Sequence, residues 1–289
     1  MNKFNCNLLK VTAIVLACSC GAPTERENKN ATDSSTSSTA EARQGSSTTE
    51  DSFENDTISK LQDQQSSAAW FRAPDGNVYK VELADEDGNL VTPQSYQEKS
   101  VNPLYCSTDL FLGIERKKQK STFLIKLMKN YATVNALRKS FPSDSVMKNL
   151  SPPITTDSNS SRVQQEKRNV RINTAFIYAI SREADNDFHV IVGDTVPFNA
   201  GRSIIVEIAG LPNPANASSD TIQHARTVFE NFFGEKCSGA YSVFTPPIRA
   251  TIAGTIFYDI GHNPGTIGTG IHKPNTSWEI HPISEFIFK

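Results

Sequence analysis

The sequence lacks the short motifs that mark the commonest hydrolytic and nucleotide-binding sites. It has no H-E-x-x-H, no G-x-S-x-G and no G-x-x-x-x-G-K-[ST] segment, and its cysteines form no C-x-x-C pair. These motifs would place a zinc ligand pair, a nucleophilic serine, a phosphate-binding loop, or a metal or redox site. Nothing in the sequence therefore spells out a reaction, and an enzyme is the less favoured interpretation.

The chain also lacks a basic excess and a long apolar run. Its formal net charge is -2, which disfavours a nucleic-acid partner. We interpret the basic run at 116–120 (RKKQK) as a solvated loop and helix face. The alternative is a patch that binds phosphate-rich polymers or anionic lipid headgroups. The apolar run at 11–17 is too short for a spanning helix.

That short apolar run belongs to a segment that reads as a secretory leader, residues 1–20. Lys3 and Lys10 supply the positive region before it, and Val15-Leu16-Ala17-Cys18 resembles a bacterial lipobox. This predicts lipidation at Cys18, with Cys20 as the alternative acceptor. An ordinary cleaved signal peptide is the competing interpretation. We expect a lipid-anchored, extracytoplasmic protein of the bacterial cell envelope, whose N-terminal lipid makes the membrane a partner.

Between the leader and the last third of the chain, composition changes twice. Residues 21–67 are crowded with Ser, Thr, Asn and Glu, which predicts a disordered tether. Residues 68–150 predict a small α+β region, with a hairpin or meander at 68–91, strands at 110–114 and 122–128, and a helix through 131–137. Residues 151–167, which contain Pro152 and Pro153, predict a linker into the terminal domain.

The chain contains few cysteines outside the leader region. Of five in all, Cys106 and Cys237 lie beyond it. In an oxidising envelope compartment these two would form a disulfide. The alternative is two buried free thiols.

Residues 168–289 have the clearest pattern of strands and helices. Runs rich in β-branched and aromatic residues at 170–180, 188–192, 203–208, 248–260 and 278–288 predict strands. Between the third and fourth runs, apolar residues recur at helical spacing over 222–233, and Gly234 marks the helix end. This is the element order of an OB-fold, a five-stranded partly open barrel. We predict a mainly β protein with a C-terminal OB-like barrel; the alternative is a small α+β sheet with one helix on a face.

Alternation along these strands sets polar side chains opposite the apolar ones. In the run 203–208, Glu207 faces away from the apolar residues at 204, 206 and 208. In the run 278–288, the same rule sets Glu279, His281 and Ile283 opposite Trp278. If the polar faces of the strands meet, they bring together one cluster, made of His189, Glu207, Asp259, His262, Glu279 and His281.

The stretches READNDFHVIVGD, SIIVEI, TIAGTIFYDIGH and WEIHPI carry a family resemblance. They resemble an uncharacterised group of bacterial secreted proteins and lipoproteins with D-x-D-x-H, V-x-E-I, D-x-x-H and E-I-H-P segments in a C-terminal OB-like domain. The resemblance covers residues 170–288. This chain departs from it at Asn263, at Ile283 after Pro282, and in an insertion before Trp278. The resemblance implies the OB-like fold and names no substrate.

Two functions remain open at this point. The first is a binding module for an envelope glycan, peptide or protein, because OB surfaces commonly recognise polymers. The alternative is a metal-dependent, nuclease-like hydrolase, with His189, His262 and His281 as candidate ligands of a divalent ion such as zinc. No other cofactor is expected. A structural Asp–His–Glu network would use the same residues, so convergence of three of these side chains beside an open cavity would favour the hydrolase.

Overall fold

The computed structural model describes residues 68–93, 105–234 and 239–289, and these belong to one compact unit. The predicted leader with Cys18 and Cys20, the predicted tether and Cys237 lie outside the described residues. Lipidation and the disulfide therefore stay predictions. Cys106 is half-buried.

The strands, in chain order, are β1 (Ala68–Arg72), β2 (Val78–Ala84), β3 (Met128–Thr133), β4 (Asn169–Arg182), β5 (Phe188–Gly193), β6 (Ser203–Ile208), β7 (Tyr241–Tyr258) and β8 (Trp278–Phe288). The helices are α1 (Lys117–Lys120), α2 (Val134–Arg138), α3 (Asp144–Lys148) and α4 (Ser219–Phe233), with 3₁₀ turns η2 (Gln164–Glu166) and η3 (Ala200–Arg202). No helix in the described part of the chain is long and apolar enough to cross a membrane.

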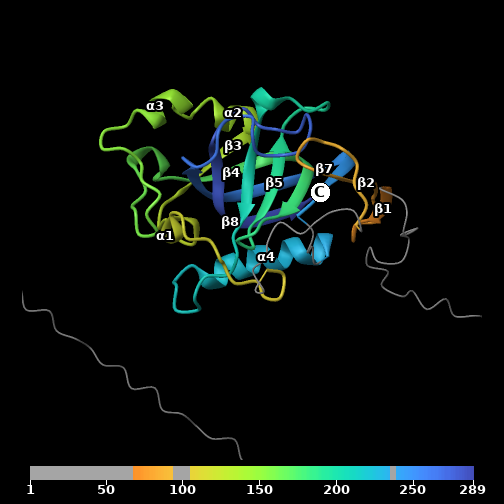
Figure 1. Cartoon of the computed structure of the whole chain (residues 1–289), viewed down its shortest axis with the longest axis horizontal. Helices are drawn as coiled ribbons and strands as arrows, with labels where there is room; N and C mark the ends of the chain where they lie inside the picture. Colours follow the sequence, from red (N-terminus) through yellow and green to blue (C-terminus); the bar gives the residue numbers. More distant parts are fainter. Residues whose placement is uncertain (1–67, 94–104, 235–238) are drawn as a thin grey trace, which may run out of the picture. The chain divides into compact units, whose positions relative to one another are not determined.

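The strands form one eight-stranded mixed sheet, five of whose members make a partial ring. The order is β1-β2-β7-β8-β6-β5-β4-β3, and β4 also pairs with β7 (Figure 1). Ring neighbours run antiparallel except β6 and β8, whose parallel pairing is short. The prediction of a mainly β protein is confirmed, and the ring follows the predicted order of three strands, a helix and two strands.

The local sequence explains the positions of most of the ring strands and of α4. The strands β4, β5, β6 and β8 lie where alternation and β-branched residues predict them, whereas β7 begins earlier, at Tyr241. Helix α4 ends at Gly234, whose φ of 74° suits glycine. Helix α4 lies beside the ring strands (Figure 1). Its buried face, including Phe229 and Phe233, joins the main hydrophobic core with residues of every ring strand.

Residues 68–150 depart further from expectation. The predicted hairpin is confirmed as β1 and β2, and β2 pairs with β7. The strands predicted at 110–114 and 122–128 are wrong, since only Leu110 makes an isolated bridge and β3 starts at Met128. The predicted helix begins three residues late, at Val134, because residues up to Thr133 pair in parallel with β4. Pairing with a neighbouring strand overrides the local helical pattern there.

One facing assignment in β8 is also wrong. Ile283 lies in the main core with Trp278, on the face opposite the one predicted. The register between β7 and β8 shifts around Gly254, so one extra residue of β8 reverses the alternation after His281. A Cβ on Gly254 would lie 2.4 Å from the Pro282 carbonyl oxygen, so this close approach requires glycine.

Candidate metal centre

Strand register explains how the polar cluster forms on the face of the ring away from the main core. His189 of β5 and Glu207 of β6 are cross-strand partners. Glu279 of β8 lies beside Ile205 of β6, two residues before Glu207. Residues two apart on a strand share a face, so His281 comes beside Glu207.

Glu207 lies at the centre of the cluster. Its Oε1 is 3.0 Å from His189 Nε2, and its Oε2 contacts His281 Nδ1. On the far side of the same ring, His281 Nε2 lies 3.4 Å from Asp187 Oδ2. Both imidazoles therefore meet one buried carboxylate, and His281 lies between two.

The remaining predicted residues form the rest of the cluster. His262 Nδ1 is 2.9 Å from Glu279 Oε1 and 3.7 Å from Asp259 Oδ2. Asp259 Oδ2 is in turn 3.3 Å from the ammonium of Lys120, which lies 3.9 Å from Glu207 Oε2. The structure thus brings the six predicted side chains into one neighbourhood and adds Asp187 and Lys120 to it.

Residues 113–120, which include α1 and are called the covering segment below, cover this polar face. The buried Arg116 donates to both oxygens of Glu166, at 2.8 and 2.9 Å, and to the Tyr258 carbonyl oxygen. Arg162 donates to the carbonyl oxygens of Ile256 and His281 and to that of Gln119. These buried bonds fix α1 over the cluster, which is why Lys120 reaches it.

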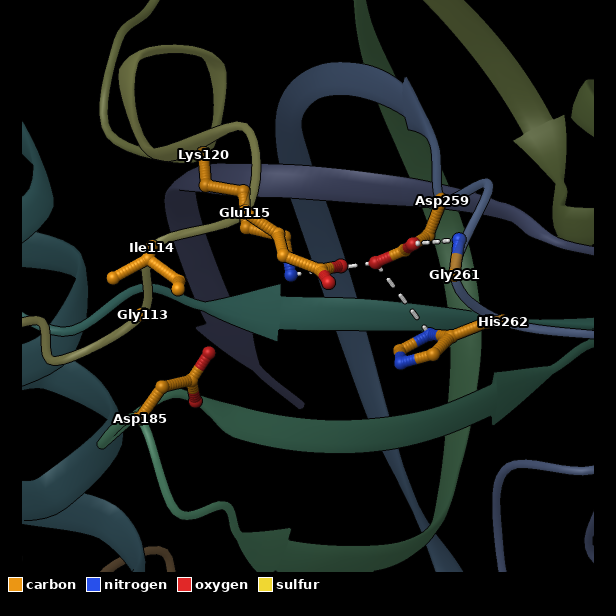
Figure 2. A pocket seen from close by; sticks show the side chains of 8 residues that line it. All are labelled: Gly113, Ile114, Glu115, Lys120, Asp185, Asp259, Gly261 and His262. Carbon is orange, nitrogen blue, oxygen red and sulfur yellow. Dashed lines mark hydrogen bonds and ion pairs between the residues drawn. The ribbon is translucent and has the colours of Figure 1, made fainter. Parts of the chain in front are cut away.

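A cavity of about 370 Å³ opens between this covering segment and the ring (Figure 2). Lys120, Asp259 and His262 line it, with Asp185 and Glu115 also among its lining residues. His262 thus faces the cavity while its Nδ1 contacts Glu279 behind it. The cluster is accessible from this side.

The cluster holds more buried acid than base. The carboxyl groups of Asp187, Glu207, Asp259 and Glu279 are all buried, and Lys120 is the buried ammonium that contacts two of them. Ionised carboxylates out of water are costly unless paired. Protons or metal cations must balance this excess.

The pKa values follow from that imbalance. Burial raises the pKa of the Asp187 and Glu279 carboxyls well above the ordinary range. Burial also acts to raise the pKa of Glu207, but Lys120 and His281 outweigh it and hold that pKa well below the ordinary value. Two carboxyls are therefore poised to take protons where no metal cation is present, and Glu207 stays ionised.

Two groups in the described residues could hold a metal ion. One is Asp187, Glu207 and His281; the other is Glu207, His262 and Glu279; in each, one donor atom per residue lies within 4.8 Å of the others. Each group joins one histidine to two carboxylates, so His189, His262 and His281 do not form a single trio. His189 contacts Glu207 but belongs to neither group.

Sequence reasoning missed Asp187 and Lys120. Asp187 alternates with His189 in the D-x-D-x-H segment, so the same-face rule could have found it. Lys120 carries no such signal. The interpretation of residues 116–120 as a solvated face is wrong for Arg116 and Lys120, which are buried because Glu166 and Asp259 pair with them.

The chain matches no family model, no curated protein and no solved structure.

Proposed function

We propose that residues 168–289 form an OB-like barrel whose polar face holds a divalent metal ion and acts as a metal-dependent hydrolase. The OB-like assignment is supported by strand order. The first ring strand pairs with the second and fourth, and the fifth lies between the third and fourth. The helix lies between the third and fourth strands. Both features are those of a five-stranded OB barrel.

The observation that carries the hydrolase proposal is the convergence of Glu207, His262 and Glu279, of which His262 lines the cavity. One imidazole nitrogen and two carboxylate oxygens suit zinc or manganese. His262 lines the cavity, whereas Glu207 and Glu279 are fully buried behind it, so catalysis requires that an ion held here keep its open coordination position toward the cavity. Such an ion would lower the pKa of a water molecule and polarise a substrate oxygen.

Two further side chains in the cavity have roles in this proposal. Lys120 and His262 hold the pKa of Asp259 below its ordinary value although burial acts to raise it, so this carboxylate is ionised at neutral pH. It is therefore placed to accept a proton from an attacking water. Lys120 supplies the positive charge at the cavity for a developing oxyanion.

The place of action is part of the proposal. The lipobox-like segment at Cys18, or at Cys20, supports a lipid-anchored protein of the bacterial envelope. The substrate would then be an envelope glycan, peptide or other polymer rather than intracellular nucleic acid. Without a metal ion, the same cavity would serve a binding module for these ligands.

The first test is metal content and hydrolysis in the purified full chain. Elemental analysis is expected to find bound zinc or manganese, and His262→Ala is expected to weaken metal binding and hydrolysis at least about 10-fold. Hydrolysis would be followed with chromogenic phosphodiester, ester and glycoside substrates. His224→Ala, on the exposed side of α4, is the matched control and should change neither quantity.

The outcomes separate the candidate functions. A chain that stays metal-free after supplementation with both ions contradicts the hydrolase and leaves a binding module with a buried polar network. Bound metal without turnover of any substrate class would identify a metal-dependent binding module instead.

A further inference from the structure

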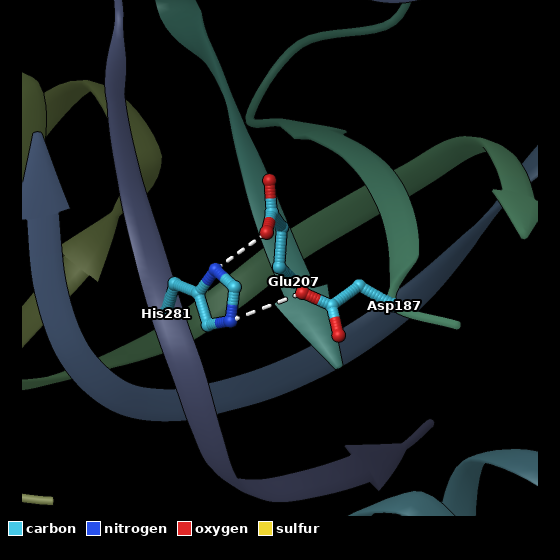
Figure 3. A group of neighbouring side chains, drawn as sticks. All are labelled: Asp187, Glu207 and His281. Atoms are coloured by element: carbon cyan, nitrogen blue, oxygen red, sulfur yellow. Dashed lines mark ion pairs between the residues drawn. The ribbon is translucent and has the colours of Figure 1, made fainter. Parts of the chain in front are cut away.

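The Asp187, Glu207 and His281 group differs from the one beside the cavity because it is closed. Figure 3 shows the His281 ring between the two carboxylates. Its Nε2 lies 3.4 Å from Asp187 Oδ2, and its Nδ1 contacts Glu207 Oε2. Asp187, Glu207 and His281 are all 0% exposed. No solvent contact competes with a ligand at these atoms.

The atoms of this group meet as close ion-pair contacts rather than as well-formed hydrogen bonds. Among the described residues, Asp187 Oδ2, both nitrogens of His281 and both oxygens of Glu207 have no hydrogen-bond partner. The other oxygen of Asp187 accepts from the Gly210 backbone N–H at 2.6 Å, which fixes the carboxylate in place. Buried polar atoms are nearly always hydrogen-bonded, so buried atoms held only by ion-pair contacts are candidates for binding a cation.

Glu207 joins this closed group to the open one. Its Oε1 lies toward His189 and its Oε2 toward His281, so the two oxygens of one carboxylate meet different neighbours. Asp187 and His281 complete one group, and His262 and Glu279 complete the other. A shared carboxylate of this kind can bridge two ions about 3.5–4 Å apart, the spacing of two-metal sites.

We propose that Asp187, Glu207 and His281 hold a second divalent cation, which makes Glu207 the bridge of a two-metal centre. This rests on the proposed function, which needs only the ion at Glu207, His262 and Glu279. An ion held by Asp187, Glu207 and His281 would be a structural ion, because protein groups surround it. It would orient Glu207 for the ion at His262 and Glu279. Two divalent ions would also offset the excess of buried carboxylates over Lys120. The competing arrangement is a protonated His281 that simply links two carboxylates.

The test counts ions in the full chain, stripped with a chelator and titrated with Mn²⁺. Calorimetry is expected to give two ions per wild-type chain, and electron paramagnetic resonance is expected to show the coupled signal of a manganese pair. Asp187→Asn and His262→Ala should each leave one ion and abolish the coupled signal. His224→Ala, exposed on α4, should keep two. Circular dichroism checks that each variant is folded.

The outcomes distinguish this inference from the proposed function. One ion that survives Asp187→Asn and is lost in His262→Ala overturns the two-metal centre and leaves the proposed function standing. One ion lost in Asp187→Asn and kept in His262→Ala overturns both, because the metal then occupies only the closed group. No ion at all also overturns both. If Asp187→Asn fails to fold, the wild-type stoichiometry and the coupled signal decide.

Discussion

Single residues decide whether the polar face is covered, and Arg116 is the clearest case. Its guanidinium makes a bidentate pair with Glu166, and both side chains are almost completely buried. Glu166 also accepts from the backbone N–H groups of Tyr258 and Val163. One pair therefore links the covering segment, the turn before β4 and the end of β7.

Removing one partner of this pair should be costly. Arg116→Ala leaves the Glu166 carboxylate buried without its cation, and we expect a loss of about 3–5 kcal/mol in the free energy of unfolding. Urea denaturation of the metal-free chain measures it. Lys118→Ala, two residues on and exposed, should stay within about 0.5 kcal/mol of wild type. Equal losses in the two variants would show that the pair contributes nothing special.

For single residues, the sequence predicts the position of a side chain only where a local rule, such as alternation along a strand, applies. Alternation along β5, β6 and β8 suffices to bring His189, Glu207 and His281 to one face. No local rule connects Arg116 to Glu166, 50 residues away, or tells Lys120 from its exposed neighbour Lys118. Long-range pairing of charges depends on the folded path of the covering segment, which periodicity does not encode.

Between elements, Asp194 connects the end of β5 to the start of α2. Its Oδ2 accepts from the Asn135 backbone N–H at 3.0 Å, and its Oδ1 lies 2.9 Å from Arg202 Nε. The carboxylate thus satisfies a donor in the first turn of α2, where negative charge is favourable. Burial acts to raise the pKa of Asp194, but the bonds from Arg202, Thr133 and Asn135 outweigh it and lower that pKa.

This gives a pH-dependent prediction. Because the folded pKa lies below the unfolded one, Asp194 stabilises the fold above about pH 4, and the contribution is lost as pH falls through the folded pKa. Asp194→Asn should therefore lower the free energy of unfolding by about 1.5 kcal/mol at pH 7. In urea titrations, the difference in the free energy of unfolding between this variant and wild type should become smaller below pH 4. Exposed Asp157→Asn is the control and should show no such gap. A gap that stays constant down to pH 3 would contradict the role of the charge.

The sequence predicts the limits of some helices and strands and misses others, and packing explains the difference. The limits of β6 and β8 follow from uninterrupted β-rich runs, and α4 follows from its apolar period and Gly234. The end of β3 cannot be predicted from the local sequence, because residues up to Thr133 adopt a strand only by pairing with β4. The irregularity after His281 also escapes alternation, since it depends on the close approach of Gly254 to Pro282.

At the scale of the whole molecule, residues 68–93 and 105–167 are built into the structure around the ring. β1 and β2 extend the sheet beyond β7, and β3 extends it beyond β4. Val134, Leu137 and Met147, all fully buried, lie in the same core as the ring strands. The covering segment adds Lys120, whose ammonium offsets part of the buried negative charge. The ring thus takes apolar and electrostatic stabilisation from the preceding residues.

We therefore expect residues 168–289 alone not to fold cooperatively. Loss of three buried core side chains costs about 2–5 kcal/mol each, and together these approach the whole stability of an ordinary domain, about 5–15 kcal/mol. Thermal unfolding followed by near-ultraviolet circular dichroism would compare this fragment with residues 68–289, which should melt as the full chain does. A fragment 168–289 with the same cooperative transition would show that the ring is self-sufficient. The covering segment would then serve only to shape the cavity and deliver Lys120 to it.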